Sequence, residues 1–155
     1  GIELVISTAD QVAWAPAVLL NLVKYLLFQE NARVILPGDR IPCGGPLVLD
    51  TDTQLTFLVA TTSDQYETEI LLPAGQCHLV HLIGCTQAEI DKALTMGSGT
   101  AGSIVLCRVL KEMGVNCDSL PDRHCLTKDA AFAETWQRVQ SQCESEWADF
   151  EGDGN

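Results

Sequence analysis

The sequence predicts an α/β fold in which a mixed, largely antiparallel sheet of about four or more strands packs against helices. Three observations predict it: short runs of β-branched and apolar residues, longer segments with apolar residues every three or four positions, and turn-rich connections between them. The chain has 155 residues, 46% of them hydrophobic, which suits one domain with a buried core. We expect a single domain over residues 1–150 and an acidic, glycine-containing tail over residues 151–155.

The first elements are a strand and a helix. Residues 2–6 are mostly β-branched and apolar, which is typical of a strand. Pro16 suits the first turn of a helix, and a wide apolar stripe then predicts a helix to about Gln29. Residues 36–52 are expected to form a stiff, sharply turning loop, and ordered loops of this length are often functional. The turn-forming residues in it are Pro37, Gly38, Pro42, Gly44, Gly45 and Pro46.

Three more strands are expected, at residues 55–61, 68–72 and 76–83. The last two are joined by a turn at residues 73–75. Because the three follow one another closely, we expect an antiparallel meander, with the first strand of the chain added to the same sheet.

Two short helices follow the strands. Thr86 and Glu89 have the spacing of a capping box, which predicts a helix that begins there and ends near Gly97. A second helix is expected over residues 101–113, with Gly114 as the first residue beyond its C-terminus.

A long amphipathic helix is expected over residues 127–150. The formal charge of the whole chain is −12, and half of it comes from seven acidic residues and one basic residue from position 129 onward. Ordinary solvation is the favoured explanation of this acidic surface, and a docking surface for a basic protein is the alternative. Such a charge argues against nucleic acid as a partner, because phosphate groups repel it. The apolar stripe of the helix is Phe132, Trp136, Val139, Cys143 and Trp147.

The cysteine pattern favours a reducing compartment. Seven cysteines are an odd number, and no two have C-x-x-C spacing, whereas a secreted disulfide scaffold is normally smaller and evenly paired. No clean apolar run of about 18–20 residues and no secretion signal is visible. We therefore expect a cytoplasmic protein with no membrane partner, and the sequence leaves its oligomeric state open.

One strand carries the residue types of a metal site. Cys77, His81 and Cys85 share a face of the strand, but successive members are about 13 Å apart. One zinc ion cannot bridge that spacing, because its bonds are about 2.0–2.3 Å long. Further ligands such as Cys117, His124 or Cys125 would be needed, so buried thiols in a core strand are favoured. We expect no metal and no cofactor.

No catalytic residues are expected, and the chain is not predicted to be an enzyme. Cys43 in the long loop would need a histidine base within about 3 Å and an oxyanion pocket, and no motif supports either. The glycine-rich run 97–102 precedes a helix and suits an anion, but it lacks the lysine of a P-loop. A connector between helices is the favoured explanation of that run. A cysteine-dependent enzyme is the remote alternative.

The order and spacing of these motifs resemble the suppressor of fused family. The family pattern has a tryptophan-containing helix with a tyrosine near its end, then a glycine-rich loop, and later a strand that runs into a threonine-capped acidic helix. The similarity covers residues 2 to about 123 and, more loosely, the last helix. It rests on Trp14, Leu19, Leu20, Leu22, Tyr25, segments 28–31, 38–47 and 78–90, and the pair Asp122 and Arg123.

The resemblance implies a non-enzymatic protein-binding module. In animals the family sequesters zinc-finger transcription factors of hedgehog signalling by gripping a short extended peptide, and stand-alone bacterial members are associated with immunity proteins that neutralise toxins. Family domains usually continue upstream of the first strand, and the animal member has a second, C-terminal domain. This sequence starts at the first strand and shows no second domain, so we expect part of the family's sheet or its cover to be absent from it. A single acidic domain with no localisation signal is more similar to the bacterial members.

The resemblance also implies where a partner binds. Tyr25 and Asp39 match the tyrosine and the loop aspartate at the family's peptide-binding edge, and we expect Arg40, Gly44 and Gly45 of the same loop to take part. A core aromatic residue and a turn-forming aspartate are the structural alternatives. The predicted function is an immunity-type or sequestering protein that neutralises a protein partner, which is expected to be basic. The alternative is a regulatory adaptor that binds a peptide of a transcription factor or signalling protein.

Overall fold

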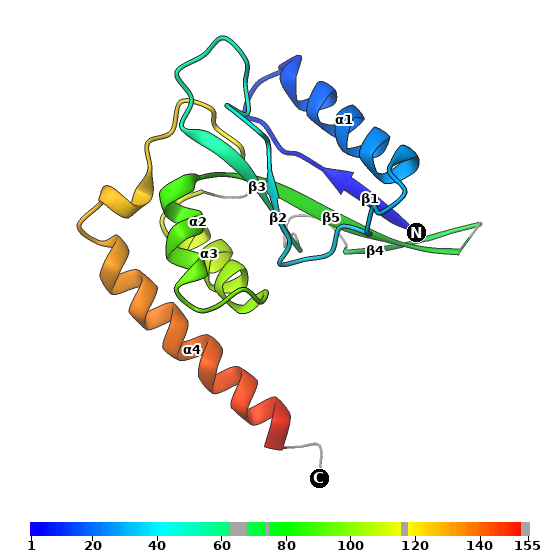
Figure 1. Cartoon of the computed structure of the whole chain (residues 1–155). Coiled ribbons are helices and arrows are strands. Elements are labelled where there is room, and N and C mark those ends of the chain that lie inside the picture. The colour runs from blue at the N-terminus through cyan, green and yellow to red at the C-terminus, as the bar shows by residue number, and fades with distance from the viewer. Residues whose placement is uncertain (63–67, 74, 116–117, 153–155) are drawn as a thin grey trace.

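Across the described residues, the fold is a five-stranded mixed sheet with helices packed against it, which confirms the predicted fold class (Figure 1). The structure is a computed structural model and describes residues 1–62, 68–73, 75–115 and 118–152. The elements are β1 (Ile2–Val5), α1 (Trp14–Phe28), β2 (Arg40–Pro42), β3 (Leu55–Thr61), β4 (Glu69–Leu72), β5 (Gly75–Thr86), α2 (Gln87–Leu94), α3 (Ala101–Glu112), the 3-10 helix η1 (Leu126–Lys128) and α4 (Phe132–Gly152).

The long strand β5 organises the sheet. The strand order is β1-β5-β3-β2, with β1 parallel to β5 and the other pairs antiparallel. His78 of β5 pairs with Ile2 on one side and with Glu69 of β4 on the other, so β4 lies on the same side of β5 as β3. The expected meander is therefore wrong, because β4 does not lie between β3 and β5: both strands pair with β5, at different residues along the same side. Strand signals identify the residues of a strand, but they do not identify its neighbours.

The long loop contains a strand that the sequence did not predict. β2 is only three residues long and is surrounded by glycine and proline, so it has no alternating pattern of its own. It exists because its backbone pairs with β3, with Asp39 O accepting from Ala60 N at 2.9 Å and Thr56 O accepting from Cys43 N at 3.0 Å. β2 ends the strand order of the sheet, an edge position that tolerates a proline such as Pro42.

The helix starts show which local signals were sufficient. The capping box is confirmed: Glu89 N donates to Thr86 Oγ1 at 3.3 Å, and Thr86 N donates to Glu89 Oε2 at 2.9 Å. Gly114 has φ +91° just beyond α3, as a residue after a helix C-terminus often does. The last helix begins at Phe132 rather than at residue 127, because the backbone is extended at Asp129 after η1.

One face of the sheet is covered by α2 and α3, and α4 packs against α3 on their outer side (Figure 1). We call these three helices and this sheet face the closed side. The helices approach closely: a Cβ on Gly102 of α3 would lie 2.0 Å from the carbonyl oxygen of Ala93 in α2. The predicted stripe on α4 is buried here except for Trp147, which is partly buried. The core of the closed side includes Val59, Ile83, Ile90, Val105, Leu106, Leu110, Phe132, Trp136, Val139 and Cys143.

A buried ion pair fastens the segment before η1 to the closed side. Glu89 is fully buried, and both its carboxylate oxygens accept from the Arg123 guanidinium, at 2.6 and 2.7 Å. Arg123 also donates to Gly84 O of β5 at 2.8 Å, and Glu89 accepts from Leu126 N at 3.0 Å. Burial acts to raise the pKa of Glu89, but the Arg123 charge and these hydrogen bonds outweigh it and hold the pKa below its usual value.

The other face of the sheet is covered by α1, and we call α1, this sheet face and residues 43–54 the open side (Figure 1). Only Ala15 of α1 is fully buried, although Trp14, Val18, Leu19, Leu22 and Leu26 pack partly against the sheet. Among the described residues, no helix is long and apolar enough to cross a membrane.

Candidate functional site

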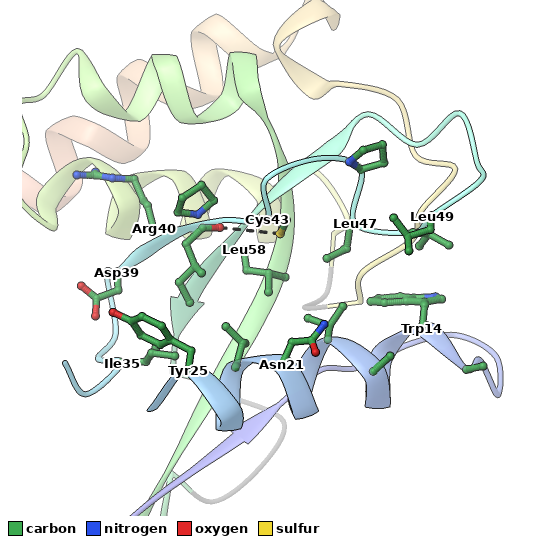
Figure 2. Close-up of a pocket in the computed structure, with 18 of the residues that line it drawn as sticks. Trp14, Asn21, Tyr25, Ile35, Asp39, Arg40, Cys43, Leu47, Leu49 and Leu58 are labelled. Atoms are coloured by element: carbon green, nitrogen blue, oxygen red, sulfur yellow. Dashed lines mark hydrogen bonds between the residues drawn. The ribbon is translucent and has the colours of Figure 1, made fainter. Parts of the chain in front are cut away.

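An open pocket of about 780 Å³ lies on the open side, between α1 and the loop that follows β2 (Figure 2). Most of its wall is apolar, with a few polar groups, which is the usual character of a binding site. The α1 side of the wall is Ala13, Trp14, Ala17, Val18, Asn21, Leu22 and Tyr25. The opposite side is Arg33, Ile35, residues 39–43, residues 46–49 and Leu58.

The two sides of the pocket are formed by different kinds of structure. On α1, Trp14, Val18, Asn21 and Tyr25 recur every three or four residues, so one face of the helix lines the pocket. On the loop side, Leu47 N donates to Leu55 O at 2.7 Å, which ties the middle of the loop back to the start of β3. No side chain of the described residues fills the gap between these two sides.

Figure 2 shows Tyr25 and Asp39 at one end of the pocket and Trp14 and Leu49 toward the other. At the polar end, Arg33 Nη2 lies 2.8 Å from Asp39 Oδ1, and Leu36 N donates to Asp39 Oδ2 at 2.9 Å. Asp39 therefore shapes its own turn, as the structural alternative for this residue states. It also lines the pocket, so the two interpretations are compatible.

The predicted partner-binding residues separate into two groups. Tyr25, Asp39 and Arg40 line the pocket, and Tyr25 is 43% exposed. Gly44 and Gly45 lie in the loop but are outside the pocket wall. Binding by any of these five residues stays a prediction.

Arg40 contributes its stem to the pocket while its charged end points away from it (Figure 2). The guanidinium donates to Ser98 O at 2.6 Å and to Gly99 O and Ser103 Oγ at 3.1 Å. The glycine-rich run 97–102 thus connects α2 to α3 and accepts hydrogen bonds from Arg40. Close packing continues at Gly38, where a Cβ would lie 2.5 Å from Thr100 Cβ. The guanidinium therefore has a structural role.

Sequence reasoning missed several residues of the pocket wall. Leu49 is the clearest case, since a leucine that is 78% exposed in a loop next to apolar wall residues suits contact with a partner. Its signal in the sequence was an apolar residue in a turn-rich loop, which is too common to single out. Trp14 and Asn21 were likewise hidden within an ordinary amphipathic helix.

The thiols and acids of the described residues offer no alternative centre. Burial raises the pKa of the Cys43 thiol to about 11, although the residue as a whole is exposed, and a thiol of high pKa is a poor nucleophile. The one hydrogen bond described for Cys43 Sγ goes to Ile41 O at 4.0 Å. Within the described ranges, no group of three or more His, Cys, Asp or Glu side chains is placed to hold a metal ion.

The comparisons with known proteins agree with this architecture. The family model described as "Suppressor of fused protein (SUFU)" matches residues 1–115. One similar solved structure, the Sufu-Fu complex, is 19% identical with a TM-score of 0.64, and the match covers 86% of this chain and 52% of that one. Drosophila Suppressor of Fused is 20% identical with a TM-score of 0.65, and the match covers 88% of this chain and 30% of that one. The chain thus spans about half or less of these relatives, and no curated protein matches it.

Proposed function

The chain belongs to the suppressor of fused family, and we propose that it is a non-catalytic module that binds a protein partner at the open pocket. The observation that carries the proposal is the pocket itself, which is apolar and accessible and has the predicted residues Tyr25 and Asp39 in its wall. One of the similar solved structures is a complex of Sufu with Fu, which supports a protein as the partner.

The role we propose is that of an immunity-type or sequestering protein. Such a protein works by occupying its partner's surface, so it needs a stable scaffold and an accessible binding face, but no catalytic group. The charge of −12 favours a basic partner, because opposite charge accelerates encounter. We place this activity in the cytoplasm, because an odd number of cysteines with no C-x-x-C spacing favours a reducing compartment.

A regulatory adaptor is the second candidate. β2 ends the strand order of the sheet next to the pocket, and such an edge can accept an extended peptide as an additional strand. An adaptor would bind a short isolated segment of its partner, whereas an immunity-type protein would require the folded partner. This difference separates the two roles.

The test uses a matched pair of exposed leucines. Leu49→Asp changes the pocket wall, and Leu94→Asp makes the same change on α2 at the closed side. We expect the wild-type chain and Leu94→Asp to retain the same protein in a pull-down, and Leu49→Asp to bind it at least about tenfold more weakly. Tyr25→Ala should weaken binding as well. Equal retention by Leu49→Asp and the wild type would refute the pocket as the docking site.

The role is then tested in cells with the retained protein. Co-expression of the chain should restore growth if that protein is toxic, and Leu49→Asp should fail to restore it. A partner that is harmless and binds through a short peptide would favour the adaptor instead.

A further inference from the structure

The helix α1 is apolar on three sides, and the structure covers only one of them. One side packs against the sheet, and a second side lines the pocket. The third side points away from both and carries Pro16, Leu20, Val23 and Leu27, which are all exposed. We call these four residues the outer stripe. A helix that is apolar all round is normally buried, and in Figure 1 no described element is drawn beyond α1.

The spacing of the outer stripe suits another helix as its cover. Its members are four, three and four residues apart, which is the spacing of a seam between two packed helices. The three large side chains of the stripe are between 41% and 70% exposed. They therefore offer a continuous apolar row along the helix rather than scattered single contacts.

The described helices offer one matching surface, which is the outer stripe itself. The described residues of α3 and α4 expose no large apolar side chain, and α2 exposes Leu94 near its end. A second copy of the chain supplies the same stripe on the same helix. Contacts in which both copies use one self-complementary surface are the usual contacts of two-fold symmetric dimers.

The charge distribution favours the same occupant. Two copies that each carry a charge of −12 repel one another, so they can meet only where few acidic groups come together. No acidic residue lies between Asp10 and Glu30, and the one charged residue of α1 is Lys24. A positive charge on this helix faces the negative field of the second copy. The same net charge opposes the anionic surface of a membrane.

We infer that two copies of the chain associate through their outer stripes, with the two α1 helices side by side about a two-fold axis. The helix has 15 residues and is about 22 Å long, so the contact is a single short seam. Such a seam is smaller than a standard protein interface, and we expect a dissociation constant on the order of 100 µM. The pocket lies on another side of α1 and stays accessible, so the inference does not depend on the proposed function.

The test is sedimentation equilibrium of the purified chain between about 5 and 500 µM, with two matched substitutions. Leu27→Lys introduces a cation into the outer stripe, and Leu94→Lys makes the same change on α2. Both lower the net negative charge by one, so repulsion between copies cannot explain a loss of association. We expect the wild type and Leu94→Lys to dimerise equally, and Leu27→Lys to do so at least about tenfold more weakly.

Two further measurements accompany the test. Urea unfolding of dilute, monomeric protein should be nearly the same for Leu27→Lys and the wild type, because Leu27 is mostly exposed in the single chain. Raising the salt concentration from about 0.05 to 0.5 M should tighten the wild-type dimer, because salt screens the repulsion between acidic copies. An association held by opposite charges would weaken instead.

A wild-type chain that stays monomeric at about 500 µM would overturn the inference. A dimer that Leu27→Lys leaves intact, or that salt weakens, would overturn it as well. Phosphatidylcholine vesicles test lipid as the alternative cover. If a monomeric chain bound them and Leu27→Lys did not, the outer stripe would be a membrane surface and the inference would be wrong. The proposed function is judged separately, since Leu49→Asp should keep the dimer and lose the partner.

Discussion

The two faces of the sheet are built in different ways. On the closed side, three helices bury their apolar stripes, and side chains as large as Trp136 are almost fully enclosed. On the open side, one helix covers the sheet, and Leu20, Leu27 and Phe28 of that helix remain exposed. The buried Glu89–Arg123 pair lies in the first region, whereas the Arg33–Asp39 pair at the pocket beside the second joins an exposed arginine to an aspartate that is 11% exposed.

This difference indicates a division of labour within one small fold. A fully buried apolar side chain contributes about 1.5–3 kcal/mol relative to an exposed one, so most of the stability should come from the closed side. The open side is then free to keep a pocket and an apolar surface that would be unfavourable in the absence of a partner. Substitutions on the closed side should therefore affect folding, whereas those on the open side should mainly affect binding.

The largest effect is expected from Arg123→Met. The substitution leaves the Glu89 carboxylate buried without its counter-ion, and breaking a buried pair in this way typically costs about 3–5 kcal/mol. Urea unfolding at neutral pH measures the loss. The double variant Glu89→Gln/Arg123→Met should recover part of it, because no charge then remains buried. An Arg123→Met protein of wild-type stability would show that the closed side does not depend on this pair.

A smaller effect is expected on acidification. By strand alternation His81 points to the same side as Ile83 and Cys85, and burial lowers its pKa from the usual 6.5, against the opposing charge of Asp118. Below pH 6.5 the unfolded state therefore binds more protons than the folded state, and stability falls as the pH decreases. Each pKa unit of difference corresponds to about 1.4 kcal/mol.

Glu89 adds to this effect in more acidic solution. Its folded-state pKa is below the usual 4.5, so its contribution is present above that pH and is lost as the pH falls through the folded value. The free energy of unfolding, measured between about pH 8 and pH 4, should decrease first below 6.5 and again below 4.5. A variant with His78→Gln and His124→Gln, which changes two exposed rings, should keep the first decrease. A flat profile in the wild type would contradict the assignment to His81.

The smallest effect is expected from Leu27→Ser on α1. Leu27 is 70% exposed, so its replacement should change the free energy of unfolding by about 0.5 kcal/mol or less. Leu22→Ser is the control on the same helix, and it should cost clearly more because Leu22 packs against the sheet. If Leu27→Ser and Leu22→Ser lower the free energy of unfolding by the same amount, the outer face of α1 is covered in solution. The open side would then be less exposed than the structure of the single chain indicates.

The sequence-based predictions were accurate where the deciding interactions are local, and they missed contacts that folding brings together. The helix starting at Thr86 and the end of α3 before Gly114 were predicted because capping groups lie within a few residues of one another. The segment that contains Tyr25 and Asp39 was identified from a family resemblance, and both residues do line the pocket. The contact between Arg33 and Asp39 was not predicted, because many loops carry an arginine and an aspartate six residues apart.

The sequence by itself determined the α/β class, most of the strands and helices, and the acidic, cysteine-rich character of the chain. These follow from local propensity, apolar periodicity and composition, which act over short separations in sequence. Only the tertiary structure decided that β2 is a strand, that β3 and β4 both pair with β5, and that the Arg40 guanidinium binds the α2–α3 connection 58 residues away. Such contacts depend on which surfaces meet after folding, and a pocket is the space that those surfaces leave unfilled.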